Sequence, residues 1–166
     1  MNLEYTPYVG VLLINSLVSV ALAFLVLRQR NTPGKAALTL LMAAALELSI
    51  TNALEVASVD LATKIFWAKI EYIGTQSGPV LFLMFALDYT YQAEWLHPRN
   101  IFLLWVLPVA SMIMAATNEW HHLVWTSITP NPLYPSILIY AHGFWFALCT
   151  MCSASIVSWS SRRRSG

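Results

Sequence analysis

Ionisable and amide side chains lie inside apolar stretches of this sequence, where a segment that only crossed a membrane would carry none. Glu47, Asn52 and Glu55 fall in one stretch, and Lys69 and Glu71 fall in the next. Glu47 is about 16 Å along its predicted helix at roughly 1.5 Å per residue. A charge at that depth costs on the order of 2.5–3.5 kcal/mol, so Glu47 should be neutral, or face other helices and be paired. A hydrogen-bonded neutral acid and a proton- or ligand-responsive site both fit this pattern.

Three further charged groups of these stretches, Glu55, Lys69 and Glu71, predict one ion pair. Lys69 and Glu71 are two positions apart and point about 200° apart on a helix, so only one of them can face the preceding helix. We expect Glu55 to pair with Lys69 as a structural ion pair that fixes the register of the two helices. Glu71 would then face other helices beside Trp67, in a functional cavity or a structural contact.

A stripe at helical spacing runs along the segment that carries Glu71. Its members recur every three or four residues, as on one face of a helix: Trp67, Glu71, Gly74, Gly78, Phe82, Phe85 and Tyr89. Gly74 and Gly78 form a G-x-x-x-G pair, which allows close approach of another helix, within the chain or in a second copy. Pro79 removes one backbone hydrogen bond and predicts a kink.

Composition indicates an integral membrane protein. The chain has 166 residues, of which 58% are hydrophobic and 10% are charged. A soluble domain of this length carries far more charge, so the lipid bilayer is the expected partner. The formal net charge of +1 excludes a nucleic-acid binder.

Hydropathy and basic residues predict an all-α, polytopic bundle of five transmembrane helices in the plasma membrane. With the amino terminus outside, seven Lys and Arg residues lie on the inner side and two on the outer side, as the positive-inside rule favours. The predicted membrane domain covers residues 1–159, and residues 160–166 form a basic cytoplasmic tail. The predicted spans are 8–27, 36–59, 65–89, 101–117 and 137–159.

Histidine and cysteine positions do not predict a metal or redox centre. His121 and His122 are adjacent and point to different sides of the chain, so they chelate poorly. Cys149 and Cys152 have C-x-x-C spacing, but they lie in an apolar run and read as small buried hydrophobes. We expect no metal, no cofactor and no catalytic residue.

Three segments resemble one family, the amino-terminal seven-helix membrane domain of bacterial and archaeal sensor histidine kinases. They are W-A-K-I-E-Y-I-G from Trp67 to Gly74 followed by Pro79, F-A-L-D-Y-T from Phe85 to Thr90, and Asn118 followed by His122 and Trp125. The resemblance covers nearly the whole chain through the fifth predicted helix. It implies a sensory domain that works as a dimer and is usually fused to kinase or cyclase modules.

These features together predict a membrane sensory input module of a two-component-type system without its own output domain. It would act through a cytoplasmic kinase or cyclase partner, with a homodimer as a further expectation. The alternatives are a small proton-coupled transporter and a haem- or quinone-binding subunit. Ligand-sensing candidates are Glu47, Asn52, Trp67, Glu71, Tyr72, His122 and Trp125.

Overall fold

The computed structural model describes residues 7–29, 32–90, 93–131 and 137–147, which divide into two compact units. The first unit comprises residues 1–112 and the second comprises residues 113–166, and each is described by itself. The elements in chain order are α1 (Pro7–Arg28), α2 (Lys35–Ala57), α3 (Leu61–Tyr89), η1 (Ala93–Leu96), α4 (Pro98–Ala116), α5 (Asn118–His121), β1 (Trp125–Pro130) and β2 (Leu138–His142).

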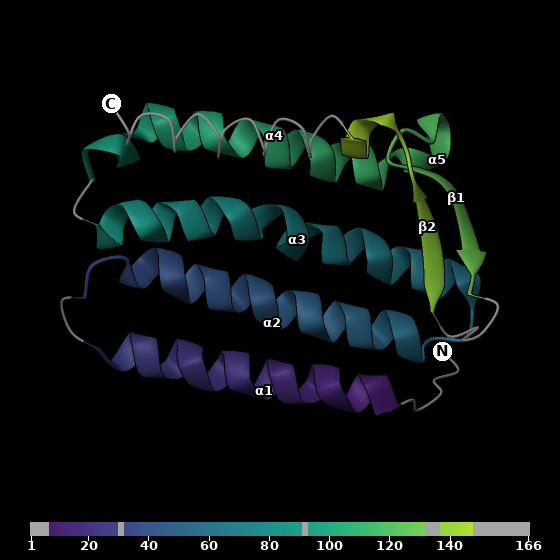
Figure 1. Cartoon of the computed structure of the whole chain (residues 1–166), viewed down its shortest axis with the longest axis horizontal. Helices are drawn as coiled ribbons and strands as arrows, with labels where there is room; N and C mark the ends of the chain where they lie inside the picture. The colour runs from purple at the N-terminus through teal and green to yellow at the C-terminus, as the bar shows by residue number, and fades with distance from the viewer. Residues whose placement is uncertain (1–6, 30–31, 91–92, 132–136, 148–166) are drawn as a thin grey trace, which may run out of the picture. The chain divides into compact units, whose positions relative to one another are not determined.

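Helices α1, α2 and α3 lie side by side, with α1 packed on α2 and α2 packed on α3 (Figure 1). Their polarity is the reverse of a soluble bundle. Ser16 and Ser19 of α1 are buried and bond to the carbonyls one turn back, at 2.9 Å each, whereas Leu17 is 71% exposed. Small and polar residues at helix contacts with large apolar residues outside are typical of membrane helices.

The contact between α1 and α2 combines one polar bond with a small apolar core. Asn15 Nδ2 donates to Ser49 Oγ at 2.6 Å, and the Ser49 hydroxyl in turn donates to Ala45 O. Val9, Ala53 and their neighbours pack nearer the start of α1. This bond and core fix α1 against α2.

Within the described residues, four helices are long and apolar enough to cross a membrane, namely α1, α2, α3 and α4. The first two lie close to the predicted spans. Helix α3 begins at Leu61 instead of residue 65 because the Asp60 carboxylate accepts the Thr63 backbone N–H at 3.0 Å and caps the helix. Helix α4 begins at Pro98 instead of residue 101, since proline suits the first position of a helix.

Pro79 lies inside α3, which continues from Leu61 to Tyr89 through it. Nearby hydroxyls bond to carbonyls one turn back, Ser77 Oγ to Ile73 O at 2.6 Å and Thr75 Oγ1 to Glu71 O at 3.1 Å. The kink expected at Pro79 stays a prediction.

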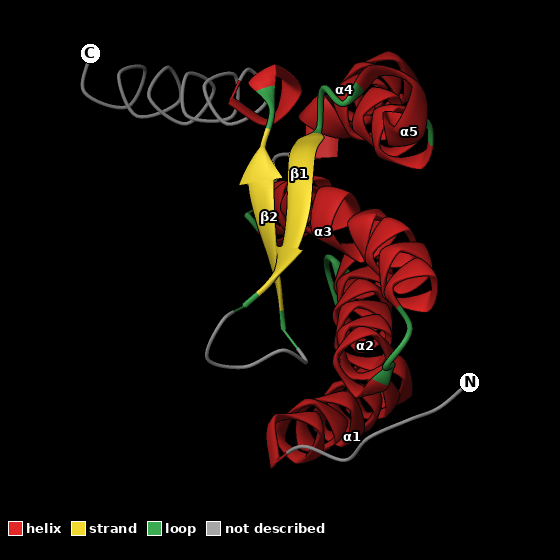
Figure 2. Cartoon of the chain, turned by 90° about the vertical axis from the view of Figure 1, so that its right-hand side faces the viewer, coloured by secondary structure: helices red, strands yellow, loops and turns green. Residues whose placement is uncertain are grey.

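The second unit holds a β-hairpin that the sequence did not predict (Figure 2). Strands β1 and β2 are antiparallel, with Trp125 opposite His142, Ile128 opposite Tyr140, and an irregularity between Trp125 and Ser127. The prediction of a helix from residue 137 was wrong for residues 138–142, where β-branched and aromatic residues form a strand. A short apolar run fits a strand as well as a helix. Residues 148–159 of that predicted span lie outside the described residues, as do Cys149, Cys152 and the tail.

Candidate functional site

The close approach of α3 to α2 depends on one glycine. A Cβ on Gly74 would collide with Glu47 Oε2 and would lie 2.8 Å from the Ala44 carbonyl oxygen. Gly78 differs, because a Cβ there would meet no atom within 4 Å. Within the described residues, the predicted close packing of the glycine pair is therefore seen at Gly74 and not at Gly78.

Glu71 faces α2, where Asn52 Nδ2 donates a hydrogen bond to Glu71 Oε1 at 3.2 Å. The Glu71 carboxyl also lies within hydrogen-bonding reach of Glu55 and near Glu47. The prediction that Glu71 points to helices other than α2 was wrong. The hydrogen bond from Asn52 places Glu71 against α2. The Glu55–Lys69 ion pair stays a prediction.

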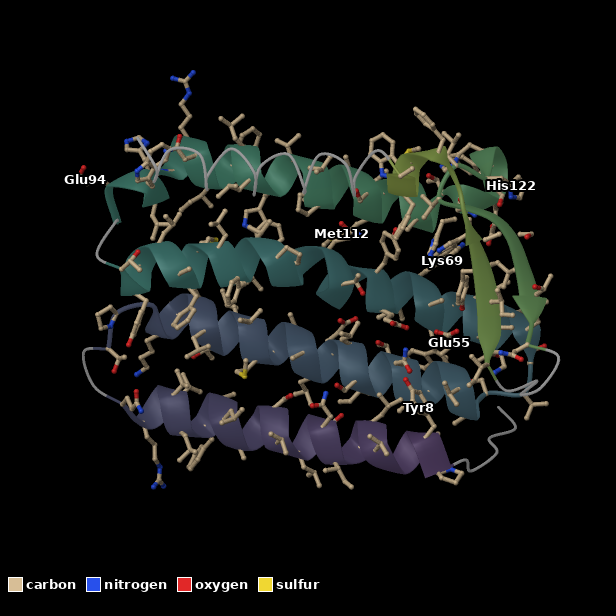
Figure 3. The ribbon with its side chains drawn as sticks, in the orientation of Figure 1. Tyr8, Glu55, Lys69, Glu94, Met112 and His122 are labelled. Carbon is tan, nitrogen blue, oxygen red and sulfur yellow. The ribbon has the colours of Figure 1, made fainter. Side chains whose placement is uncertain are left out.

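The sequence analysis missed a buried amino group at the same end of these helices. Lys64 is 4% exposed, and its Nζ donates to the Glu55 backbone carbonyl at 3.1 Å. Lys64 falls between the predicted spans 36–59 and 65–89, and the Asp60 cap brings it into α3. Glu55 itself is buried and lies in the layer between α2 and α3 (Figure 3).

We call the residues that line this contact the α2–α3 seam. Glu47, Asn52 and Glu55 belong to α2, and Glu71 and Gly74 belong to α3. Trp67 is included because it falls on the same face of α3 as Glu71 and Gly74, four and seven residues before them. The seam therefore brings together four of the predicted ligand-sensing residues. Tyr72, a fifth, is half-buried on α3.

Several polar atoms in the seam are buried without a hydrogen-bond partner in the protein. They are both carboxyl oxygens of Glu47, Oδ1 of Asn52 and Nε1 of Trp67. Burying such a group unpaired typically costs about 1–3 kcal/mol. Native proteins rarely leave these groups together unless the place has a function or holds water. The seam is therefore the strongest candidate for a functional site in the described part of the chain.

The far end of the same two helices is closed by a complete set of contacts, which we call the Gly34 clamp (Gly34, Phe85 and Asp88). Gly34 has φ 75° and precedes α2. Its N–H donates to Asp88 Oδ2 at 2.8 Å, and the Phe85 ring covers it. An anion at a helix N-terminus is favourable. The F-A-L-D segment thus ties α3 to the turn before α2, a role that the sequence analysis missed.

The third segment of the resemblance, Asn118 followed by His122 and Trp125, serves to fold the second unit. Asn118 is buried; its Oδ1 accepts from the N–H groups of Val124 and Trp125 at 3.0 and 3.1 Å, and its Nδ2 donates to Trp125 O at 3.0 Å. Trp125 is buried against Tyr140, with ring centroids 5.4 Å apart. His122 is exposed with φ 52° at the end of α5. Of the two predicted sensing residues here, His122 is accessible and Trp125 is part of the hairpin core.

His121 is also accounted for by local structure. Its ring accepts the Leu123 N–H at Nδ1, and Nε2 lies 3.1 Å from Thr117 Oγ1. Among the residues that the structure describes, no three His, Cys, Asp or Glu side chains are grouped to hold a metal ion.

Four apolar helices with a polar interior contact define an α-helical membrane protein. Residues 11–162 match the family described as the N-terminal 7TM region of histidine kinase, HisKA_7TM. The chain belongs to this family, so the resemblance seen in the sequence is confirmed. Searches among curated proteins and among solved structures found no match. The family is a sensory input region of histidine kinases and not a catalytic domain.

Proposed function

We propose that this chain is the signal-input module of a two-component-type system in the plasma membrane, crossing it several times. Its α2–α3 seam responds to the stimulus, and the response is passed to a cytoplasmic kinase or cyclase partner. Family membership supports the sensory role. The observation that carries the choice of the seam is its set of buried, unpartnered polar atoms on Glu47, Asn52 and Trp67.

The physical basis is that α2 and α3 have two accessible arrangements at the seam, one closely packed and one hydrated. Interior polar groups that are only partly satisfied gain hydrogen bonds when a ligand, a proton or water reaches them, and such gains shift conformational populations. Because Gly74 brings the helices into close contact at Glu47, a change in the hydration of Glu47 must change the spacing of α2 and α3. The Gly34 clamp, which links α3 to the turn before α2, would hold the far end of the two helices together, so that the change in spacing tilts one helix against the other.

A fusion to a known kinase tests this function. The chain would be joined to the dimerisation and catalytic domains of a histidine kinase, and autophosphorylation would be measured in membrane vesicles. We expect Trp67→Phe and Glu71→Gln each to change kinase activity several-fold. Glu94→Gln is the matched control, because Glu94 is an exposed carboxylate on η1 outside the seam. Equal activity of the parent and both seam variants would contradict the proposal.

A further inference from the structure

We propose that the α2–α3 seam is a proton-binding site, in which Glu47 takes up the proton and the Glu55–Glu71 pair lies beside it. The site stands independently of the proposed function, and only the idea that its proton is the signal rests on that function. Three features of the seam support a proton: the chemistry of its unpartnered atoms, the charges that surround them and the packing at Gly74.

The unpartnered atoms of the seam are three oxygens and one indole N–H. Buried acceptors without donors are destabilising. An amide oxygen such as Asn52 Oδ1 can only accept a hydrogen bond. A carboxyl can bind a proton and then donate a hydrogen bond itself. Glu47 has both oxygens unpartnered, so it is the group of the seam with most to gain from a proton.

The charges around Glu47 favour the protonated form. On the packed helices, the other ionisable groups toward this end are Glu55 on α2 and Lys64, Lys69 and Glu71 on α3. Lys64 Nζ donates to the Glu55 backbone carbonyl at 3.1 Å. Lys64 lies ten residues and Lys69 five residues before Gly74, the residue of α3 that meets Glu47. The Glu71 carboxyl lies near Glu47, and a nearby negative charge disfavours an ionised Glu47.

The more distant helices add no opposite charge to this region. In the described residues of α1, the only Lys, Arg, Asp or Glu side chain is Arg28, at its end. In those of α4 it is Arg99, near its start.

A proton fits the seam better than a metal ion. Hard cations need several oxygen ligands gathered around one point, and no three metal-ligating side chains are so grouped in the described residues. A proton needs only one carboxyl and an acceptor.

Loss of the proton would be coupled to movement. An ionised Glu47 needs water or donors, but Gly74 and the Ala44 carbonyl confine its carboxyl. Hydration therefore requires α2 and α3 to separate at this point. Water that entered the seam could also accept the hydrogen bond of the Trp67 indole N–H.

The test uses the full chain in lipid nanodiscs and infrared difference spectroscopy between acidic and alkaline buffer, which detects the C=O band of protonated carboxyls. We expect a pH-dependent band that is lost in Glu47→Gln, retained in Glu47→Asp and unchanged in Glu94→Gln. Helix content by circular dichroism identifies a variant that fails to fold. In that event the frequency of the band carries the test: a band from Glu47 should shift in Glu47→Asp, and an unshifted band would overturn the site.

Two outcomes overturn the site: a parent protein with no pH-dependent carboxyl band, or a band of full amplitude in folded Glu47→Gln. Failure of the sensory function is a different result. In that case the carboxyl band would be lost in Glu47→Gln as expected, while the kinase activity of the fusion would be the same in the parent, Trp67→Phe and Glu71→Gln.

Discussion

The two ends of the α2–α3 pair are built in opposite ways. At the Gly34 clamp the donor and acceptor are matched, because Gly34 N–H meets Asp88 Oδ2 at 2.8 Å under the Phe85 ring. Beside it, Lys35 Nζ donates to the Leu27 and Gln29 carbonyls at 2.8 Å each. In the α2–α3 seam, four buried polar atoms have no protein partner. The same two helices thus have one saturated end and one incomplete end.

This difference separates structural polar groups from responsive ones. A saturated buried contact resists change, since opening it leaves polar groups unpaired. An incomplete contact loses little when it opens and gains when a donor arrives. Substitutions at the clamp should therefore lower the free energy of unfolding. Substitutions of the seam residues with unpartnered atoms should instead change the response to the stimulus.

The largest expected effect on stability is that of Gly34→Ala. Positive φ and overpacking against Phe85 each add strain, so the free energy of unfolding should fall by about 2–4 kcal/mol. Steric-trapping unfolding in lipid bicelles would measure it. A loss below about 1 kcal/mol, the usual cost of an ordinary substitution, would show that the clamp is not rigid.

Gly74→Ala should have the next largest effect. Its Cβ would lie 2.8 Å from the Ala44 carbonyl, and relief of this overlap should cost about 1–3 kcal/mol. Gly78→Ala is the matched control on the same helix. With no atom within 4 Å of its Cβ, it should be neutral or stabilise by roughly 0.5–1 kcal/mol. Equal losses in both variants would argue against a close approach specific to Gly74.

Asp88→Ala should destabilise by about 1 kcal/mol, because the Gly34 N–H loses its acceptor. Asp88→Asn keeps an acceptor oxygen and should lose about half as much or less. The same unfolding measurement compares the two. If Asp88→Ala and Asp88→Asn lost the same free energy of unfolding, the hydrogen bond from the Gly34 N–H would not explain how Asp88 stabilises the clamp.

The smallest effect on stability should be that of Glu47→Gln at acidic pH. Because the Glu47 oxygens have no protein partner to lose, the change should stay within about 0.5 kcal/mol, below the ~1 kcal/mol of a typical hydrogen bond. A loss as large as that of Gly34→Ala would mean that Glu47 is a structural residue.

The sequence predicted the helical membrane fold, because length and hydropathy alone decide whether a helix can span a bilayer. It did not predict the first residue of α3, which depends on the cap that the Asp60 carboxylate forms with the Thr63 N–H. It also missed the hairpin, since residues 138–142 are apolar enough for either structure.

The sequence pointed to several of the residues that the structure brings together, but not to their geometry. Glu47, Asn52, Trp67 and Glu71 stood out as polar or amphipathic groups in apolar stretches, and all four lie in the seam. Helical angles allowed either Lys69 or Glu71 to face α2, and the bond from Asn52 that decides it is a tertiary contact. The collision that fixes Gly74 against Glu47 depends on the spacing of two helices, which no local pattern specifies.

The most direct test compares movement at the two ends in one protein. Spin labels on Ile50 and Ile73 would flank the seam, and labels on Leu40 and Phe82 would lie toward the clamp; all four side chains are exposed. Electron–electron resonance would give both distances in nanodiscs at acidic and alkaline pH. We predict that the seam pair separates at alkaline pH while the clamp pair keeps its distance. Equal shifts of both pairs, or no shift of the seam pair, would contradict a responsive seam held beside a rigid clamp.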